Sequence, residues 1–106
     1  RSARAKYEQA QAELESGGEL LALEMTQAAN NLDEALLERR LADTSMEAAE
    51  ENLRMSRRQY EAGLETLSDY LEAQAVWQQA SRTQVEARIG SYLRWLEYRK
   101  AAGLLD

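Results

Sequence analysis

The sequence predicts an all-α fold, a long antiparallel coiled-coil helical hairpin that forms a single domain. Ala, Glu, Lys, Leu and Arg supply 62 of the 106 residues, and a composition dominated by these five types is typical of coiled coils and long helices. Proline is absent, whereas average usage of about 5% predicts roughly five prolines. Val, Ile and Thr, which favour strands, number only seven, so a β-barrel, a β-sandwich or an α/β fold is not expected.

The first expected element is a long helix over residues 1–61. It contains no proline, and its weakest point is the stretch Ser16-Gly17-Gly18. Two glycines cost about 2 kcal/mol relative to alanine in a helix, which a helix packed along its length tolerates. We therefore expect a bend at residues 16–18, with a true turn there as the alternative.

This helix carries a seven-residue repeat in which large and small side chains alternate. Small residues let a neighbouring helix approach closely, and large ones fill the grooves of that neighbour. A 3.5-residue period sustained over this length predicts a left-handed supercoil. Arg39 interrupts the repeat, and we expect it either to extend its charged end into solvent or to specify register and partner. The repeat comprises Leu21, Met25, Ala28, Leu32, Ala35, Arg39, Ala42, Met46, Ala49, Leu53, Ser56 and Tyr60.

The second expected element is a tip turn over residues 62–66. Gly63 can adopt the left-handed conformation that ends a helix. Thr66 or Ser68 can cap the helix that follows, and Asp69 lies three residues after Thr66, close to a capping-box spacing. A turn of this length suits two antiparallel helices.

The third expected element is a returning helix over residues 67–103, followed by a tail over residues 104–106. Gly103 is a helix-stop glycine, and Arg99 and Lys100 lie in the last turn, where cations suit the helix dipole. We expect the interior Gly90 to permit close packing, and the two tryptophans, Trp77 and Trp95, to be packing residues.

Apolar residues occupy several faces of this returning helix. A two-helix hairpin buries one face per helix, so further apolar columns predict more than one neighbour and a larger bundle or a closed ring of helices. One column contains Ala73, Ala80, Ala87 and Ala101, a second contains Leu64, Leu71, Val85 and Tyr92, and a third contains Tyr70, Trp77 and Tyr98.

Composition also excludes several functions. The chain has no Cys and no His, so it lacks thiolate ligands, the commonest metal ligand and the commonest general base. We predict that it is not an enzyme and that it holds no cofactor or metal. A net charge of −6 argues against a nucleic-acid partner.

We see no signal peptide and no apolar run that approaches the roughly 18 residues of a membrane span. Because the chain begins with Arg1, we expect it to be a piece of a longer protein.

The stretch from Tyr60 to Gln74 resembles the outer-membrane efflux protein family, the TolC-like channels. The family shows a tyrosine, a glycine three residues on, a small polar residue, an acid, a leucine and an Ala-Gln pair, which correspond here to the sequence YEAGLETLSDYLEAQ. Upstream, residues 48–53 resemble the end of the long descending helix of the family, and residues 87–103 resemble the returning helix. The order and spacing of these motifs are more specific than any single motif.

The resemblance implies a segment of a trimeric outer-membrane channel of a Gram-negative bacterium. This hairpin would lie in the periplasm, outside the membrane, as part of a helical barrel. It would export small molecules or proteins with a periplasmic adaptor and, indirectly, an inner-membrane transporter. The family match places Tyr60, Gly63, Leu64 and Thr66 in the tip where adaptors dock. Some members carry an arginine where this chain has Glu65, so a closed-state link made by that arginine does not carry over.

The resemblance also places Asp69 and Glu72 in the acidic lining of the pore entrance. The two acids lie three residues apart on one helical face. A plainer interpretation is that acids near a helix N-terminus stabilise the helix dipole.

Two other functions fit the residues. One is a structural coiled-coil interaction protein without a transport role, and the other is the α-hairpin of a periplasmic adaptor.

Overall fold

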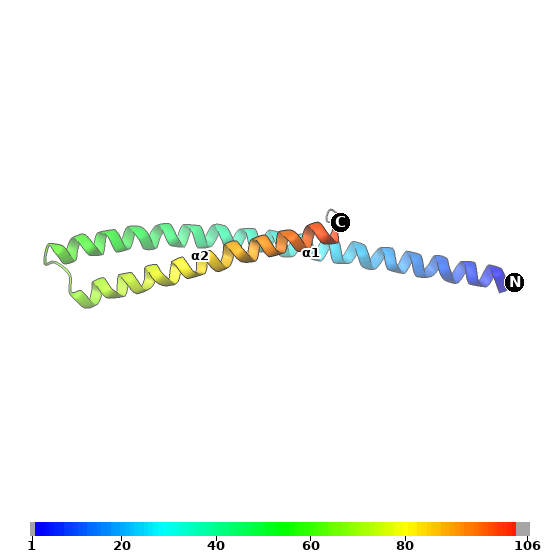
Figure 1. The fold of residues 1–106 in the computed structure, drawn as a ribbon, viewed down its shortest axis with the longest axis horizontal. Helices are drawn as coiled ribbons and strands as arrows, with labels where there is room; N and C mark the ends of the chain where they lie inside the picture. Colours follow the sequence, from blue (N-terminus) through cyan, green and yellow to red (C-terminus); the bar gives the residue numbers. More distant parts are fainter. Residues whose placement is uncertain (1, 104–106) are drawn as a thin grey trace.

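The computed structural model describes residues 2–103 and consists of two antiparallel helices (Figure 1). Helix α1 spans Ser2–Glu61 and helix α2 spans Leu67–Ala101. They form a rod of 92 × 22 × 13 Å, and no strand occurs between residues 2 and 103. The all-α hairpin predicted from the sequence is confirmed. The predicted tail over residues 104–106, like Arg1, lies outside the described residues.

The contact face of α1 is the small-residue column of the repeat. Alanine side chains there let α2 approach closely, and the larger Met46 fills space beside them. Arg39 keeps its repeat position but is exposed, as expected for a charged side chain that extends into solvent. The buried residues of α1 are Ala35, Ala42, Met46, Ala49 and Ser56.

The contact face of α2 combines the first and third apolar columns of the sequence. Ala73 and Ser91 are buried, and the second column, which includes Leu71, Val85 and Tyr92, is exposed on the other side of the helix. The helix therefore has a second apolar side, which α1 does not cover. The half-buried residues of the contact face are Tyr70, Trp77, Ala80, Gln84, Ala87, Tyr98 and Ala101.

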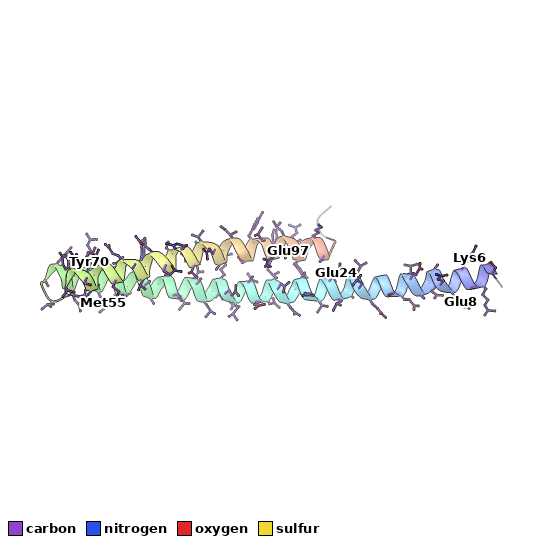
Figure 2. All side chains as sticks on the ribbon, turned by 90° about the horizontal axis from the view of Figure 1, so that it is seen from below. Lys6, Glu8, Glu24, Met55, Tyr70 and Glu97 are labelled. Carbon is purple, nitrogen blue, oxygen red and sulfur yellow. The ribbon has the colours of Figure 1, made fainter. Side chains whose placement is uncertain are left out.

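Helix α1 is longer than α2 and extends past its C-terminal end (Figures 1 and 2). Every residue from 2 to 27 is exposed, and we call this stretch the overhang. Its 26 residues span about 39 Å at 1.5 Å per residue. The helix continues through Gly17 and Gly18 without a turn, and a bend at residues 16–18 stays a prediction.

The two glycines of the returning helix differ in role. Gly103 has φ +73°, and its N–H donates to the carbonyl of Lys100 at 3.1 Å, so it ends α2 as predicted. Gly90 is helical, but nothing lies within 4 Å of the position that a Cβ would take there. Gly90 therefore makes no close approach to α1, and close packing of Gly90 against any other helix stays a prediction.

Enlarging a side chain in the small-residue column should push the two helices apart. Ala49 is 5% exposed, whereas its neighbour Ala48 faces solvent. We expect Ala49→Leu to lower the free energy of unfolding by about 1–3 kcal/mol through overpacking, and Ala48→Leu to change it by about 0.5 kcal/mol or less. Urea unfolding followed by circular dichroism measures both. Equal effects of the two variants would contradict the packing described here.

Candidate functional site

The turn at the hairpin tip begins with a Schellman motif around Gly63. The N–H of Leu64 donates to the carbonyl of Gln59 at 2.8 Å, and the N–H of Gly63 donates to the carbonyl of Tyr60 at 3.0 Å. Gly63 has φ +76°, a conformation that costs other residues about 1–2 kcal/mol. These two bonds satisfy the last carbonyls of α1 and fix the direction in which the chain leaves it.

The turn ends at Thr66, which caps α2. Its side chain accepts a hydrogen bond from the N–H of Asp69 at 3.1 Å. Thr66 has the extended backbone of an N-cap residue, with φ −78° and ψ 160°. Of the two caps that the sequence allows, Thr66 is the one used, and its hydroxyl is occupied within the turn.

One side-chain contact joins the two helices beside the turn, and another joins α1 to the turn itself. The rings of Tyr60 and Tyr70 stack with centroids 5.3 Å apart and an interplanar angle of 18°. The hydroxyl of Ser56, a residue that is 4% exposed, donates a hydrogen bond to the carboxylate of Glu65. Sequence reasoning missed both pairs. The sequence offered one sign of the Ser56–Glu65 hydrogen bond: a serine stands in a column of alanines, nine residues before an acid of the turn.

An exposed apolar ridge lies on the tip. Leu64 is 80% exposed, and Leu67 and Leu71 are each about half exposed; we call these three the tip ridge. A hydrophobic contact often joins the residue at the Leu64 position of a Schellman motif to the one at the Gln59 position. Because the latter is polar here, the Leu64 side chain is not needed for the cap and is left to solvent.

Asp69 and Glu72 lie beside a groove between the two helices near the tip. Both are exposed, and the groove has a volume of about 240 Å³. Glu65 lines it as well, so the structure brings a third acid to the two that the sequence singled out. The remaining lining residues are Asn52, Ser56, Ala73 and Val76.

The chemistry available to this acidic groove is electrostatic. The side chains that line it are acidic or uncharged, so it presents a negative potential to solvent. Within residues 2–103, no three acids lie close enough together to hold a metal ion. Asp69 is also the acid in the first turn of α2, so the helix-dipole interpretation and the pore-lining interpretation both remain compatible with its position.

A second polar cluster joins the helices midway along the hairpin. The side-chain amide of Gln84 donates to the carboxylate of Asp43 at 2.8 Å, and Arg88 lies 3.3 Å from the same oxygen. The Gln84 hydrogen bond is the largest cause that lowers the pKa of Asp43, partial burial opposes it, and the charges of Arg88 and Arg39 add to the lowering. The sequence alone did not reveal this cluster.

The far half of α2 carries an aromatic and cationic surface. The Tyr92 and Trp95 rings stack at 5.9 Å, and the Arg99 guanidinium lies 4.8 Å from the centroid of the Trp95 ring. A groove of about 370 Å³ runs beside these rings toward Arg39 of α1. Trp77 is half-buried; Trp95 is 39% exposed and lines this groove together with Leu32 and Leu36 of α1. That both tryptophans are packing residues stays a prediction.

Neither helix of the described part of the chain has a segment apolar enough to cross a membrane.

Comparison with protein families identifies a matching family. The model of the family described as "Outer membrane efflux protein" matches residues 1–103. The match confirms the resemblance drawn from the residues around the tip turn. No curated protein and no solved structure matches the chain significantly.

The Asp43 cluster predicts a specific pH dependence of stability. The folded-state pKa of Asp43 is lowered. The contribution of its carboxylate to folding stability is therefore present above the unfolded-state pKa of about 3.9 and is lost as pH falls through the folded-state pKa. We expect Asp43→Asn to be less stable than the wild type at pH 7, and the difference to shrink below about pH 4. Thermal unfolding at pH 7 and pH 3 measures this.

The control is Asp33→Asn, which alters an exposed acid of the same helix. It should leave the melting temperature at pH 7 unchanged. The ionic role of Asp43 would be contradicted if the wild type and Asp43→Asn differed in melting temperature by the same amount at both pH values.

Proposed function

The chain belongs to the outer membrane efflux protein family, and we propose that it is the periplasmic tunnel segment of a trimeric channel in that family. In this role it forms part of a passive conduit through which an inner-membrane transporter and a periplasmic adaptor export small molecules or proteins. The family favours this function over a structural coiled coil or an adaptor hairpin.

The observation that carries the proposal is the apolar surface of α2 on two opposite sides. One side packs on α1, and the other exposes large apolar residues that include Val85, Ile89 and Tyr92. A helix in the wall of a closed ring has a neighbour on each side, so both of its sides are apolar. A hairpin that worked alone would leave this second side in water, which costs about 25 cal/mol for each Å² of apolar surface.

The tip supplies a rigid shape for adaptor docking. Gly63 and Thr66 use their backbone and hydroxyl within the turn, and Tyr60 uses its ring against Tyr70. We therefore assign to these three the role of holding the tip, and to Leu64 the direct contact with the adaptor. An exposed leucine on a preorganised turn costs little entropy when it enters a pocket of a partner.

The acidic groove supplies the charge of the pore entrance. In a trimer, three copies of Asp69 and Glu72 face one another across a narrow opening. A ring of carboxylates in a constricted pore creates a negative potential that favours cations over anions. Glu65 lines the same groove and adds to that potential near the turn.

The docking role of the tip can be tested in the full-length channel that contains this hairpin. We expect Leu64→Glu to abolish adaptor-dependent export, because it places a charge where the adaptor provides an apolar pocket. The loss of a central contact of this kind costs about 2 kcal/mol or more, which is about 30-fold in affinity. Export is measured as drug efflux from cells, and trimer formation by size-exclusion chromatography.

Leu64→Met is the matched control, since it keeps an apolar side chain of similar volume. It should export normally. Normal export by Leu64→Glu, with an intact trimer, would overturn the docking role.

The role of the two acids can be tested by single-channel recording in a lipid bilayer. We expect the double variant Asp69→Asn, Glu72→Gln to lose much of the preference for cations over anions, because the negative potential of the entrance is removed. The control is Glu47→Gln, which neutralises an exposed acid of α1 away from the groove. An unchanged ion preference in the double variant would assign the acids to helix stabilisation alone.

A further inference from the structure

Ser56 is the polar member of the buried residues of α1. The other small residues of its column that are buried, Ala35, Ala42 and Ala49, are alanines. Ser56 is 4% exposed, as little as any of them. An alanine would occupy the same place and has the higher helix propensity, so close packing of the helices does not call for a serine here. The feature of Ser56 that needs an explanation is therefore its hydroxyl.

The hydroxyl of Ser56 bonds outside its own helix. It donates to the carboxylate of Glu65, nine residues later in the chain, and both residues line the groove between the helices at the tip. Serine hydroxyls in helices commonly bond a carbonyl three or four residues earlier in the same helix. Ser91 does so, because it is 2% exposed and donates to the carbonyl of Arg88 at 2.9 Å. The two buried serines thus differ in what their hydroxyls hold.

The backbone of the turn is held on both sides of Glu65 but not at Glu65 itself. Before it, the N–H of Leu64 donates back to α1, and after it, the hydroxyl of Thr66 accepts from Asp69 and caps α2. Within residues 2–103, no backbone–backbone hydrogen bond outside the helices involves Glu65. The side-chain bond to Ser56 is therefore the hydrogen bond that ties this residue to α1. Its acceptor is charged, and such bonds are roughly twice as strong as neutral ones.

We propose that Ser56 is a positioning residue of the tip, which holds the turn through Glu65 and so presents Leu64 in a fixed orientation. Leu64 directly precedes Glu65 and is 80% exposed, so packing of its own side chain does not fix it. A turn that is already held has less conformational freedom to lose when a partner binds. The presentation of Leu64 to an adaptor rests on the proposed function, whereas the hold of Ser56 on the turn does not.

The hold on the turn can be tested by NMR relaxation of the backbone amides in the 106-residue chain. We expect Ser56→Ala to lower the order parameters of the Leu64 and Glu65 amides from about 0.85, typical of rigid backbone, to below about 0.6. The melting temperature should change little, because alanine is already the residue of this column and favours the helix. A lower melting temperature with an ordered turn would overturn the proposal, because it indicates a purely structural serine.

Three further variants separate the bond from packing and from charge. Ser91→Ala removes a similarly buried hydroxyl that bonds within its own helix and should leave the turn ordered. Glu65→Gln keeps an acceptor for the Ser56 hydroxyl and should keep the turn ordered as well, whereas Glu65→Ala should loosen it.

The combination of Ser56→Ala with Glu65→Ala gives the sharpest result. A residue that acts only through another has no effect once the other is removed, so the double variant should be no looser than Glu65→Ala alone. A further loss of order in the double variant would overturn the proposal, since Ser56 would then act through its packing.

Ethidium efflux from cells that carry the full-length channel tests the consequence for docking. We expect Ser56→Ala to slow efflux several-fold with an intact trimer, and Ser91→Ala to leave it unchanged. If Leu64→Glu abolishes export but Ser56→Ala does not slow it, the presentation of Leu64 by Ser56 is overturned while adaptor docking stands. If Leu64→Glu exports normally, the proposed docking fails, and the order of the turn in the chain still decides the role of Ser56.

Discussion

The close approach of α1 and α2 along a column of small side chains is the constraint on which the rest of the molecule depends. Ala35, Ala42 and Ala49 face α2, with Ser56 continuing the column toward the tip. Small side chains bring two helices together but bury little apolar area, and among residues 2–103 no large side chain is fully buried. The hairpin therefore has a well-defined register and a thin core. Most of its large apolar side chains remain outside the contact that holds it together.

The tip keeps its shape by other means. Its geometry comes from backbone hydrogen bonds around Gly63, the Thr66 cap and the Tyr60–Tyr70 stack, each made between residues no more than ten apart. Local interactions of this kind do not require a large core, so the tip keeps its geometry beside a thin core. A rod with a thin core and a rigid end is suited to a role in which other helices cover its sides and a partner binds its end.

The elements of this fold follow from the sequence because their signals are local. The seven-residue repeat predicted which face of α1 is buried, and Gly63 and Thr66 predicted the turn, since each acts through its own backbone or its nearest neighbours. The contacts between helices do not follow in the same way. Whether Ser56 meets Glu65, or Asp43 meets Gln84, depends on the axial register and rotation of one helix against the other, to within a few ångströms. Whether Gly90 approaches α1 depends on the same rotation of α2.

The residues of the tip differ in role because some of their groups already form bonds within the fold. A side chain or backbone group that bonds a partner inside the turn is held in position by that bond, and losing the bond costs stability. Gly63, Thr66 and Tyr60 are committed in this way, and so is Glu65 through Ser56. Leu64 and the side chains of Asp69 and Glu72 project from the same framework. In the proposed function, specificity for an adaptor or for a charged solute resides in these outward groups, while the committed residues determine how accurately the outward groups are positioned.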